Sequence, residues 1–176
     1  MKKIEVTNPF DQSLVGTVEI MDDRAVELSL AKAFSLSTKM RHGLSKHLRI
    51  SILKKTAEIM RSRASKLALL IAEEGGKPLQ DAIVEVDRAI DGVETCVSEI
   101  GSLTGNEVAM GLTEASSNKI AFTTKEPIGV VLAISAFNHP LNLIVHQVAP
   151  AVATGCPVLV KPADDTPLSC RKFVEI

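Results

Sequence analysis

The sequence of 176 residues is long enough for one domain with a buried core, on the usual prior of about 150 residues per domain. Hydrophobic residues make up 45% and charged residues 23%, which excludes a disordered or low-complexity chain, and five Phe without Trp or Tyr argue against a stacking surface for single-stranded nucleic acid. The net charge of −1 conceals an asymmetry: residues 39–66 carry nine Lys or Arg and one acid, whereas residues 73–126 carry eleven acids and four bases.

The amino-terminal half is predicted to contain short strands followed by helices. Residues 4–20 alternate loosely around a turn, which is typical of two short strands. A helix is predicted from Asp22 and another from Ser45 as its N-cap, because apolar residues recur at helical spacing: Ala25, Val26, Ala33 and Phe34 in the first, and Leu48, Ile52, Ile59 and Met60 in the second. A third helix, residues 66–74, is expected to end at Gly75-Gly76, where glycine can adopt the left-handed conformation.

The basic segment, residues 39–66, coincides with the second helix. Such a run could attract nucleic acid or anionic lipid. Its charges alternate with core-type apolar residues, and no nucleic-acid-binding motif accompanies them. The favoured interpretation is that neighbouring helices carry solvated faces of opposite charge that partly compensate.

The strongest helical pattern follows Pro78. Apolar residues recur at steps of three and four, which predicts one buried helix face ending near Gly101: Ile83, Val86, Ile90, Val93, Val97 and Ile100. From Gly101 to Lys125 the composition changes to Gly, Thr, Ser and Asn, with a β-like piece at residues 120–124. This favours an extended hairpin or arm, and such arms commonly pair with another subunit.

No charged side chain occurs in the 34 residues from Pro127 to Val160. The run is not expected to span a membrane, because Asn, His, Gln, Pro and Gly interrupt it. Its pieces predict a strand at 128–134, a turn at 135–139, a helix at 140–154 and a strand at 158–160. Strand, helix and strand in that order form a βαβ unit with buried parallel strands. Beyond it, Thr166 is expected to cap a helix that begins at Pro167.

Common catalytic and metal motifs are absent. The sequence has no GxGxxG after a strand, no GxxxxGK[ST], no HExxH and no GxSxG. His139 and His146 lack Cys or acidic companions, so no metal site is expected. Cys96, Cys156 and Cys170 are odd in number and without CxxC spacing, which predicts neither a disulfide framework nor a zinc knuckle. Cys156 is interpreted as a small core residue. A reducing cytoplasm is the simplest location for a protein with such cysteines. The first residues predict no secretory signal.

Two residues at the expected carboxyl edge of the parallel sheet are candidates for function. Asn138 lies in the turn after the first strand, where ligands bind in open α/β folds. Its amide can donate a hydrogen bond to an oxygen that gains negative charge, although a turn-stabilising role is at least as compatible with the sequence. Lys161 ends the second strand and is followed by Asp164 and Asp165. A lysine and a carboxylate there suit ribose hydroxyls, and a surface ion pair fits equally well.

The segment from Pro127 to Cys170, with its PIGVV strand, FNHP turn, APAVATGCPV crossover and KPADDTP loop, closely resembles the NAD(P)-dependent aldehyde dehydrogenase superfamily. Upstream, EEGGKPLQDAIVEVDRAID at residues 73–91 is similar to the family's GKP helix, and Asn8-Pro9 is similar to its amino-terminal NP strand. The resemblance covers nearly the whole chain, and the combination of motifs is specific.

This resemblance implies an α/β fold: the amino-terminal part of the aldehyde dehydrogenase fold, with an incomplete Rossmann-like parallel sheet, flanking helices and a β arm. Residues 1–100 would form the helical part of the cofactor-binding domain, residues 101–125 part of the oligomerisation arm, and residues 126–176 the truncated first βαβ unit of the NAD(P)-binding domain. The family oxidises aldehydes to acids or thioesters with NAD or NADP. A small aldehyde substrate and a dimeric or tetrameric full enzyme are therefore implied, with no nucleic-acid or membrane partner.

The resemblance also implies roles for individual residues. Asn138 matches the family asparagine that helps form the oxyanion hole for the thiohemiacetal. Cofactor-binding roles follow for the strand end beside the nicotinamide and for the loop that meets the adenosine ribose: Ile134, Ser135, Ala136, Phe137, Lys161, Pro162, Ala163 and Asp164. Asp164 stands where Glu is frequent, so the choice between NAD and NADP stays open. Ala136 replaces a frequent proline. His139 stands where Phe is common at the substrate tunnel, which suggests a polar or anionic small aldehyde.

The family's nucleophilic cysteine, general-base glutamate and glycine-containing cofactor loop all match positions downstream of Ile176, and none of the three cysteines falls in the nucleophile's motif. Without a thiolate to attack the aldehyde or a base to activate water, the chain alone is expected to be inactive and the reaction is expected of a longer protein. The alternative is a stand-alone truncated paralogue, a binding or regulatory module that pairs with a full subunit through residues 101–125.

Overall fold

The structure is a computed structural model that describes residues 2–40 and 43–176. Helices and strands follow one another in chain order as β1 (Lys3–Thr7), β2 (Leu14–Glu19), α1 (Asp23–Lys39), α2 (Lys46–Ser62), α3 (Ala64–Gly75), α4 (Leu79–Glu99), β3 (Glu107–Val108), β4 (Ala121–Phe122), β5 (Val131–Ile134), α5 (Pro140–Thr154), β6 (Val158–Lys161) and α6 (Pro167–Val174). Short 3-10 turns lie at Ile100–Ser102 and Glu114–Ser116.

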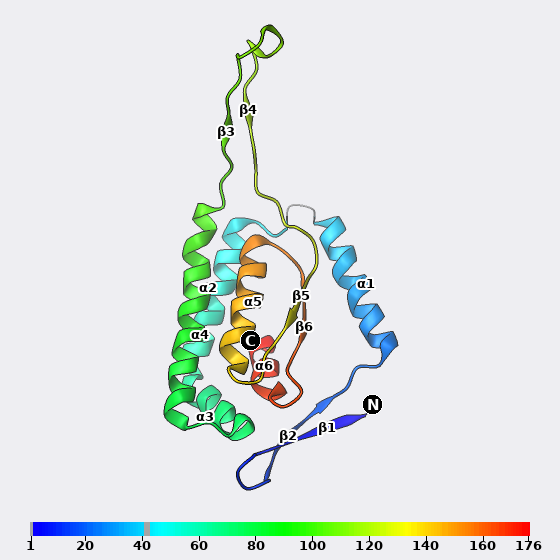
Figure 1. The fold of residues 1–176 in the computed structure, drawn as a ribbon, viewed down its shortest axis with the longest axis vertical. Helices are drawn as coiled ribbons and strands as arrows, with labels where there is room; N and C mark the ends of the chain where they lie inside the picture. The colour runs from blue at the N-terminus through cyan, green and yellow to red at the C-terminus, as the bar shows by residue number, and fades with distance from the viewer. Residues whose placement is uncertain (1, 41–42) are drawn as a thin grey trace.

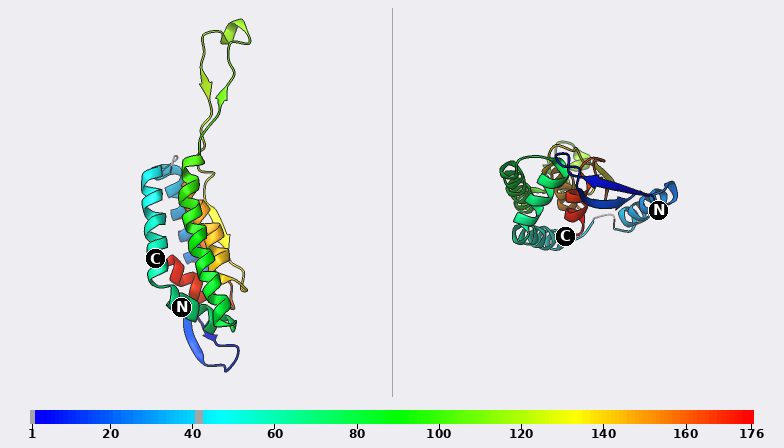
Figure 2. Two further views of the ribbon diagram at one scale, coloured as in Figure 1. Left: turned by 90° about the vertical axis from the view of Figure 1, so that its left-hand side faces the viewer. Right: turned by 90° about the horizontal axis from the view of Figure 1, so that it is seen from below.

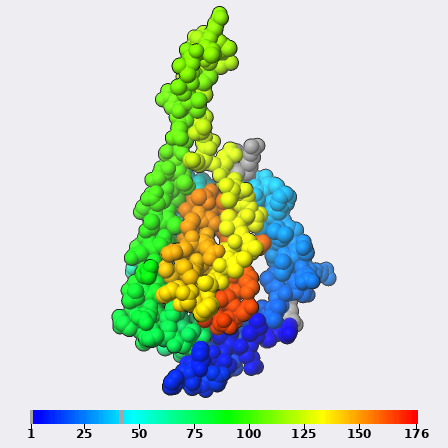
Figure 3. Space-filling view, viewed as in Figure 1, coloured from blue at the N-terminus to red at the C-terminus, as the bar shows by residue number. Residues whose placement is uncertain are grey.

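Three parts are visible in the ribbon (Figure 1). Helices α2 to α6 and the β5–β6 pair form the body, β1 and β2 form an antiparallel hairpin at its lower end, and the β3–β4 arm projects far from the top of α4. Turned by 90°, the molecule shows α2 and α4 running side by side, with the arm continuing their direction (Figure 2). The space-filling view shows the arm standing clear of the body (Figure 3).

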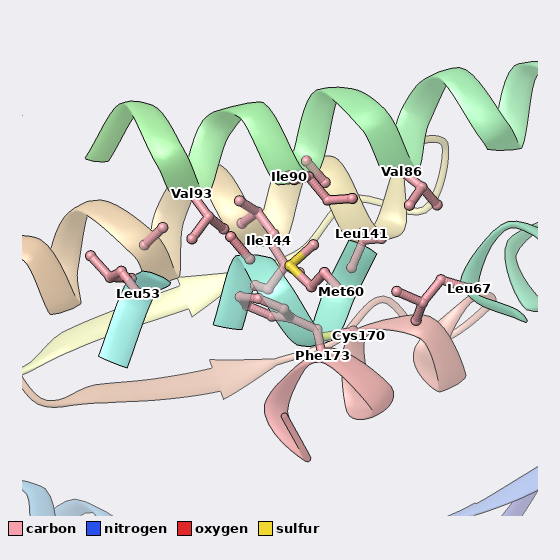
Figure 4. Close-up of a cluster of buried hydrophobic side chains, with 14 of the residues drawn as sticks. Leu53, Met60, Leu67, Val86, Ile90, Val93, Leu141, Ile144, Cys170 and Phe173 are labelled. Carbon is pink, nitrogen blue, oxygen red and sulfur yellow. The ribbon is translucent and has the colours of Figure 1, made fainter. Parts of the chain in front are cut away.

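The hydrophobic core lies where α2, α4, α5 and α6 meet (Figure 4). Met60 of α2 is fully buried and points between the side chains of α4 and those of α6. Leu141 and Ile144 of α5 and Phe173 of α6 pack into the same cluster. Residues from helices distant in sequence therefore bury one another, so the body is held by long-range rather than local contacts.

The predicted apolar face of α4 is confirmed along most of its length. Val86, Ile90 and Val93 are buried, as is Ile100 just beyond the helix. Ile83 is different, because 40% of its surface is exposed at the start of the helix. The buried face there is formed instead by Ala82 and Glu85.

The first two predicted helices exist, but their packing differs from the apolar pattern. Helix α2 buries the face that carries Arg49, Leu53, Ala57 and Met60, whereas 48% of Leu48 and 43% of Ile52 are exposed. Helix α1 lies apart from the other helices (Figure 1), and Ala33 is its one buried residue in the described chain. Apolar spacing thus marks the helices correctly, and it identifies Met60 and Ala33 as buried, but it does not identify the rest of the buried faces.

Local caps mark the starts of α1 and α2 and the ends of α3 and α5. Asp22 accepts a hydrogen bond from the Ala25 amide at the start of α1, and Ser45 does so from the Leu48 amide at the start of α2. Gly76 and Gly155 end α3 and α5 in the left-handed conformation. Both glycines lie where the sequence predicts the end of a helix.

The βαβ unit is present, with one shortened strand. Helix α5 and strand β6 lie where predicted, and β5 pairs with β6 in parallel, with Val131 opposite Val158 and Ile134 opposite Lys161. Strand β5 begins at Val131 rather than at residue 128. Gly129 has a φ of 122°, which interrupts the extended conformation before the strand.

The arm is a hairpin of residues 103–125 in which β3 and β4 pair antiparallel. At its base a Cβ on Gly105 would lie 1.5 Å from the Thr123 carbonyl oxygen, so only glycine permits this approach of the two backbones. Leu112, Ile120 and Phe122 are 83%, 91% and 72% exposed. An arm that presents such apolar side chains to solvent has the character of an interaction surface.

The opposite charges of α2 and α4 meet at one ion pair, in which Arg61 lies 2.9 Å from Glu94. Arg49 is buried and donates to the Ala153 carbonyl at the end of α5. Arg41, part of the same basic segment, lies outside the described residues. These contacts agree with partial compensation between neighbouring helices. None of the helices within residues 2–40 and 43–176 combines the length and apolarity needed to cross a bilayer.

Candidate functional site

The two groups of predicted site residues lie side by side at the carboxyl ends of β5 and β6. Ile134 is opposite Lys161 in the register, and the Ser135 amide donates to the Lys161 carbonyl at 2.9 Å. The turn from Ser135 to His139 follows β5, while the loop from Pro162 to Asp164 follows β6. The parallel pairing thus brings stretches separated by more than twenty residues to one edge, the position where open α/β sheets bind ligands.

The backbone of the β5–α5 turn is fixed by several hydrogen bonds. Ser135 is buried, and its hydroxyl donates to the Pro140 carbonyl at 3.2 Å. The Thr166 hydroxyl donates to the Phe137 carbonyl at 3.1 Å, and the Lys77 ammonium donates to the Asn138 carbonyl at 2.5 Å. Asn138 itself is exposed. Its backbone is therefore held while its side-chain amide stays accessible.

A hollow of about 790 Å³ lies beside this turn. Asn138 and Asp164 both line it, so the structure brings these two predicted site residues to a common space. Phe137 of the same turn also lines it, and further lining residues come from β1, the α3–α4 junction and the loop before α6, among them Glu74, Lys77, Asp165 and Thr166. Pro162 does not share this hollow; it lines a separate one of about 670 Å³ with Val160 and Cys170.

Lys161 and Asp164 form an ion pair with 2.6 Å between the ammonium nitrogen and a carboxylate oxygen. Their side chains are 53% and 79% exposed, so the pair contributes little to stability. The arrangement is a surface ion pair, and it is also compatible with ribose binding. An exposed ammonium and carboxylate can give up their mutual contact and bind the hydroxyls of a diol instead.

His139 precedes α5 and faces two charged groups. Its Nδ1 lies 3.4 Å from the Lys77 ammonium and 3.4 Å from a Glu85 carboxylate oxygen. Within the described part of the chain, no three His, Cys, Asp or Glu side chains gather closely enough to hold a metal ion. The imidazole is thus part of a polar cluster at the foot of the turn.

Glu85 is the main site residue that sequence reasoning missed. Its side chain is fully buried, and its Oε1 accepts hydrogen bonds from the Leu141 amide at 2.9 Å and the Asn142 amide at 3.1 Å. Its Oε2 pairs with Lys77 at 2.6 Å. Glu85 therefore caps the amino terminus of α5 from another helix. The available signal was a single acid on the buried face of α4, since such acids are rarely buried without a partner.

Glu74 has an equivalent role at α6 and corrects the prediction for Thr166. Thr166 is the residue before α6, but its hydroxyl bonds to Phe137, and Glu74 accepts from the Leu168 amide at 2.7 Å and the Ser169 amide at 2.9 Å instead. Only 2% of Glu74 is exposed. Burial raises the pKa of its carboxyl, while hydrogen bonds from Ser169 and Leu168 oppose that rise.

Gln147 occupies the outer edge of β5. Its side-chain oxygen accepts from the Ile134 amide at 2.9 Å, and its side-chain nitrogen donates to the Ile134 carbonyl at 2.8 Å. The amide thus takes the place that a neighbouring strand would hold at this residue. Nothing in the sequence around Gln147 distinguished this contact from an ordinary polar residue on a helix.

The cysteines lack the features of a nucleophile. Cys156 is buried, as predicted. Burial, with the nearby Glu74 charge, raises the pKa of Cys170 to about 12. Burial also raises the pKa of the Cys96 thiol. Both shifts favour the protonated thiol, which is a poor nucleophile.

The fold and the edge together define an α/β protein of the class that binds ligands outside the carboxyl ends of parallel strands. The sequence model of the aldehyde dehydrogenase family matches residues 1–176. The chain therefore belongs to the aldehyde dehydrogenase family.

Similar proteins agree with this assignment. The chain is 33% identical over 175 residues to 3-sulfolactaldehyde dehydrogenase of Priestia aryabhattai, covering 99% of this chain and 36% of that protein. It is 36% identical over 171 residues to aspartate-semialdehyde dehydrogenase 1 of Pseudomonas canavaninivorans, covering 97% of this chain and 36% of that protein. The chain thus spans a little over a third of the length of these curated relatives.

Solved structures show the same fold. The NADP complex of NADP-dependent glyceraldehyde-3-phosphate dehydrogenase from Bacillus halodurans C-125 superposes with a TM-score of 0.91 at 32% identity, covering 99% of this chain and 37% of that one. Aldehyde dehydrogenase 21 from Physcomitrella patens, in complex with succinate, gives 0.92 at 29% identity, covering 99% of this chain and 36% of that one. The fold is therefore the amino-terminal α/β part of the aldehyde dehydrogenase fold.

Proposed function

We propose that residues 1–176 form the amino-terminal portion of an NAD(P)-dependent aldehyde dehydrogenase that oxidises a small aldehyde to the acid or thioester. The observation that carries the proposal is the family match over the whole chain, joined to the exposed edge where Asn138 and Lys161 follow paired parallel strands. The proposed parent of this portion is a longer polypeptide, the full-length enzyme. In it, the nucleophile and the general base come from residues that this chain does not supply.

The residues at the strand ends fit a nicotinamide dinucleotide. Lys161 offers an ammonium and Asp164 a carboxylate, both exposed, which suits the donor and acceptor needs of ribose hydroxyls. The exposed Phe137 and the half-exposed end of β5 offer apolar surface beside them. When bound, NAD(P) supplies the hydride acceptor for aldehyde oxidation. Solved relatives with NADP bound, including the Bacillus halodurans enzyme, support this assignment.

Asn138 would act on the reacting oxygen. A side-chain amide at a fixed position donates a hydrogen bond to an oxygen that becomes negative when a nucleophile adds to the aldehyde carbonyl. Removing one such donor typically lowers kcat by about 10²- to 10³-fold. The exposure of the amide beside a hollow, with its backbone held by Lys77, is the arrangement that this role requires.

The cofactor assignment is tested by equilibrium titration of the full-length enzyme with NAD and NADP. In Lys161→Met the dissociation constant of the preferred cofactor should rise, because an ammonium donor to the ribose is lost. Lys172→Met serves as the control, since Lys172 also forms an exposed ion pair, with Glu175, but lies on α6. Equal affinities for wild type and Lys161→Met would contradict the role of Lys161.

A polar or anionic aldehyde is the proposed substrate. His139 lies beside the Lys77 ammonium, and imidazole is a better neighbour than phenyl for an anionic group. Relatives named for 3-sulfolactaldehyde, an anionic sulfonate, and for aspartate semialdehyde, a zwitterion, support a polar or anionic substrate. In the full-length enzyme, His139→Phe should lower kcat/KM for an anionic aldehyde relative to an alkyl aldehyde. An unchanged ratio would rule out this role for His139.

A further inference from the structure

We infer that Lys77 and Glu85 are positioning residues for Asn138: a buried ion pair that sets the backbone from which the amide of Asn138 projects. The inference rests on the proposed function, because it concerns the geometry of the group assigned to the reacting oxygen. Lys77 also lines the hollow beside Asn138, whereas Glu85 does not. Both act through the turn between β5 and α5.

The pair reaches the turn from two directions. Lys77 lies in the short link between α3 and α4, and its ammonium donates to the Asn138 carbonyl at 2.5 Å and to Glu85 Oε2 at 2.6 Å. The other oxygen of Glu85 accepts from the amides of Leu141 and Asn142 in the first turn of α5. The residues on either side of His139 are therefore tied to the same ion pair, which restricts rotation of the intervening backbone.

Burial makes this arrangement specific. The Glu85 side chain is fully buried and that of Lys77 is 16% exposed, so neither charge is easily solvated if the pair separates. The positive end of α5 and the ammonium both stabilise the Glu85 carboxylate. A single side chain thus links the helix start to the lysine that holds Asn138, and displacement of either partner shifts the turn.

A second contact with the turn comes from a different part of the chain. Thr166, which precedes α6, donates to the Phe137 carbonyl, so the two consecutive carbonyls of Phe137 and Asn138 are engaged by separate elements. Loss of Lys77 therefore leaves one anchor in place. We expect a displaced amide rather than an unfolded turn, and a misplacement of about 1 Å can lower kcat by up to about 100-fold.

The contact itself is tested in the 176-residue chain by NMR, with no need for catalysis. Because removing Lys77 alone would leave Glu85 as an unpaired buried charge, the informative variant is the charge-neutral double substitution Lys77→Met with Glu85→Gln. The ¹⁵N shift of the His139 amide, which shares a peptide bond with the Asn138 carbonyl, should move in this variant. It should stay unchanged in Lys55→Met with Glu58→Gln, which removes an exposed ion pair on α2. An unmoved His139 resonance in the first double variant would overturn the inference.

Kinetics of the full-length enzyme then separate the inference from the proposed function. The Lys77→Met, Glu85→Gln variant should lower kcat by about 10- to 100-fold with little change in the KM for the cofactor, and adding Asn138→Ala should lower kcat no further than Asn138→Ala alone. A large loss in Asn138→Ala beside an unchanged kcat in the Lys77, Glu85 variant would overturn the inference and leave the proposed function intact. Unchanged kcat in both would refute the role of Asn138 and the inference together.

Discussion

At the scale of single residues, two glutamates decide the local order around the candidate site. Glu74 and Glu85 are both buried, and each accepts hydrogen bonds from two backbone amides at the start of a helix that lies far away in sequence. Side chains of α3 and α4 thereby replace the local caps that α6 and α5 lack. The positions of Asn138 and of the loop after β6 therefore depend on acids outside the βαβ unit.

Glu74 predicts a pH dependence of stability. Its pKa is raised in the folded chain, so the folded state holds the proton more tightly than the unfolded state. This contribution is fully present below the ordinary pKa of a glutamate and is lost as the pH rises through the raised value. Relative to Glu74→Gln, the wild-type free energy of unfolding should fall as the pH rises through this window, measured by urea unfolding at several pH values.

Glu175 provides a control of opposite sign. Hydrogen bonds from Lys172 and Arg171 lower the pKa of this exposed carboxyl, so its contribution is present above the ordinary pKa and is lost as the pH falls. The difference between wild type and Glu175→Gln should therefore change with pH in the other direction. Parallel pH profiles for wild type and Glu74→Gln would contradict the assignment.

At the scale of elements, helix ends were more predictable than helix contacts. Gly75-Gly76 after α3 and the Ser45 cap of α2 are local signals, and they place the ends of their helices correctly. The buried side of α2 was not predictable, because both of its faces carry apolar residues and only the neighbouring helices select Leu53 over Ile52. Packing between segments that are distant in sequence produces no local pattern from which the buried side of a helix could be predicted.

In the candidate site, too, local features were predictable and long-range contacts were not. Asn138 and Lys161 could be placed at one edge from the strand, helix and strand order alone. Their supporting contacts could not, because Lys77 lies in the link before α4, and an acid such as Glu85 on the apolar side of that helix carries no indication of its partner. The cap of α6 was assigned to Thr166 on a local rule, and a long-range contact from Glu74 took that place.

Gly76 carries an element-scale prediction. Its φ of +64° lies in the left-handed region, and a Cβ there would lie 3.1 Å from Pro9. Gly76→Ala should lower the free energy of unfolding by about 1–2 kcal/mol, measured by urea unfolding. Gly101→Ala is the matched control, since nothing lies within 4 Å of a Cβ at that position. Equal losses at the two glycines would contradict this explanation.

At the scale of the whole molecule, the arm is the most exposed feature. It stands apart from the body (Figure 3) and presents Ile120 and Phe122 to solvent. If it pairs with a second subunit, as we propose for a dimer or tetramer, Ile120→Lys with Phe122→Lys should lower the mass of the full-length enzyme in sedimentation equilibrium. Phe10→Lys, at a phenylalanine in the β1–β2 turn that is 92% exposed, should not change it. An unchanged mass in the arm variant would refute the role of the arm.

Several apolar side chains on the body are exposed as well. Leu132 and Ile134 on β5 are 61% and 57% exposed, and Phe34 on α1 is 64% exposed. Only part of the hydrophobic residues of the sequence are thus buried in the core. The chain spans 36% of the length of 3-sulfolactaldehyde dehydrogenase of Priestia aryabhattai, and these apolar surfaces are exposed in it.

The most direct test is aldehyde-dependent formation of NAD(P)H by the purified 176-residue chain, measured beside the full-length enzyme. We predict no formation by the 176-residue chain, because none of its three cysteines falls in the motif of the family's nucleophile, and turnover by the full-length enzyme. Formation of NAD(P)H by the 176-residue chain that disappears when Cys96, Cys156 and Cys170 are replaced by Ser would contradict the account.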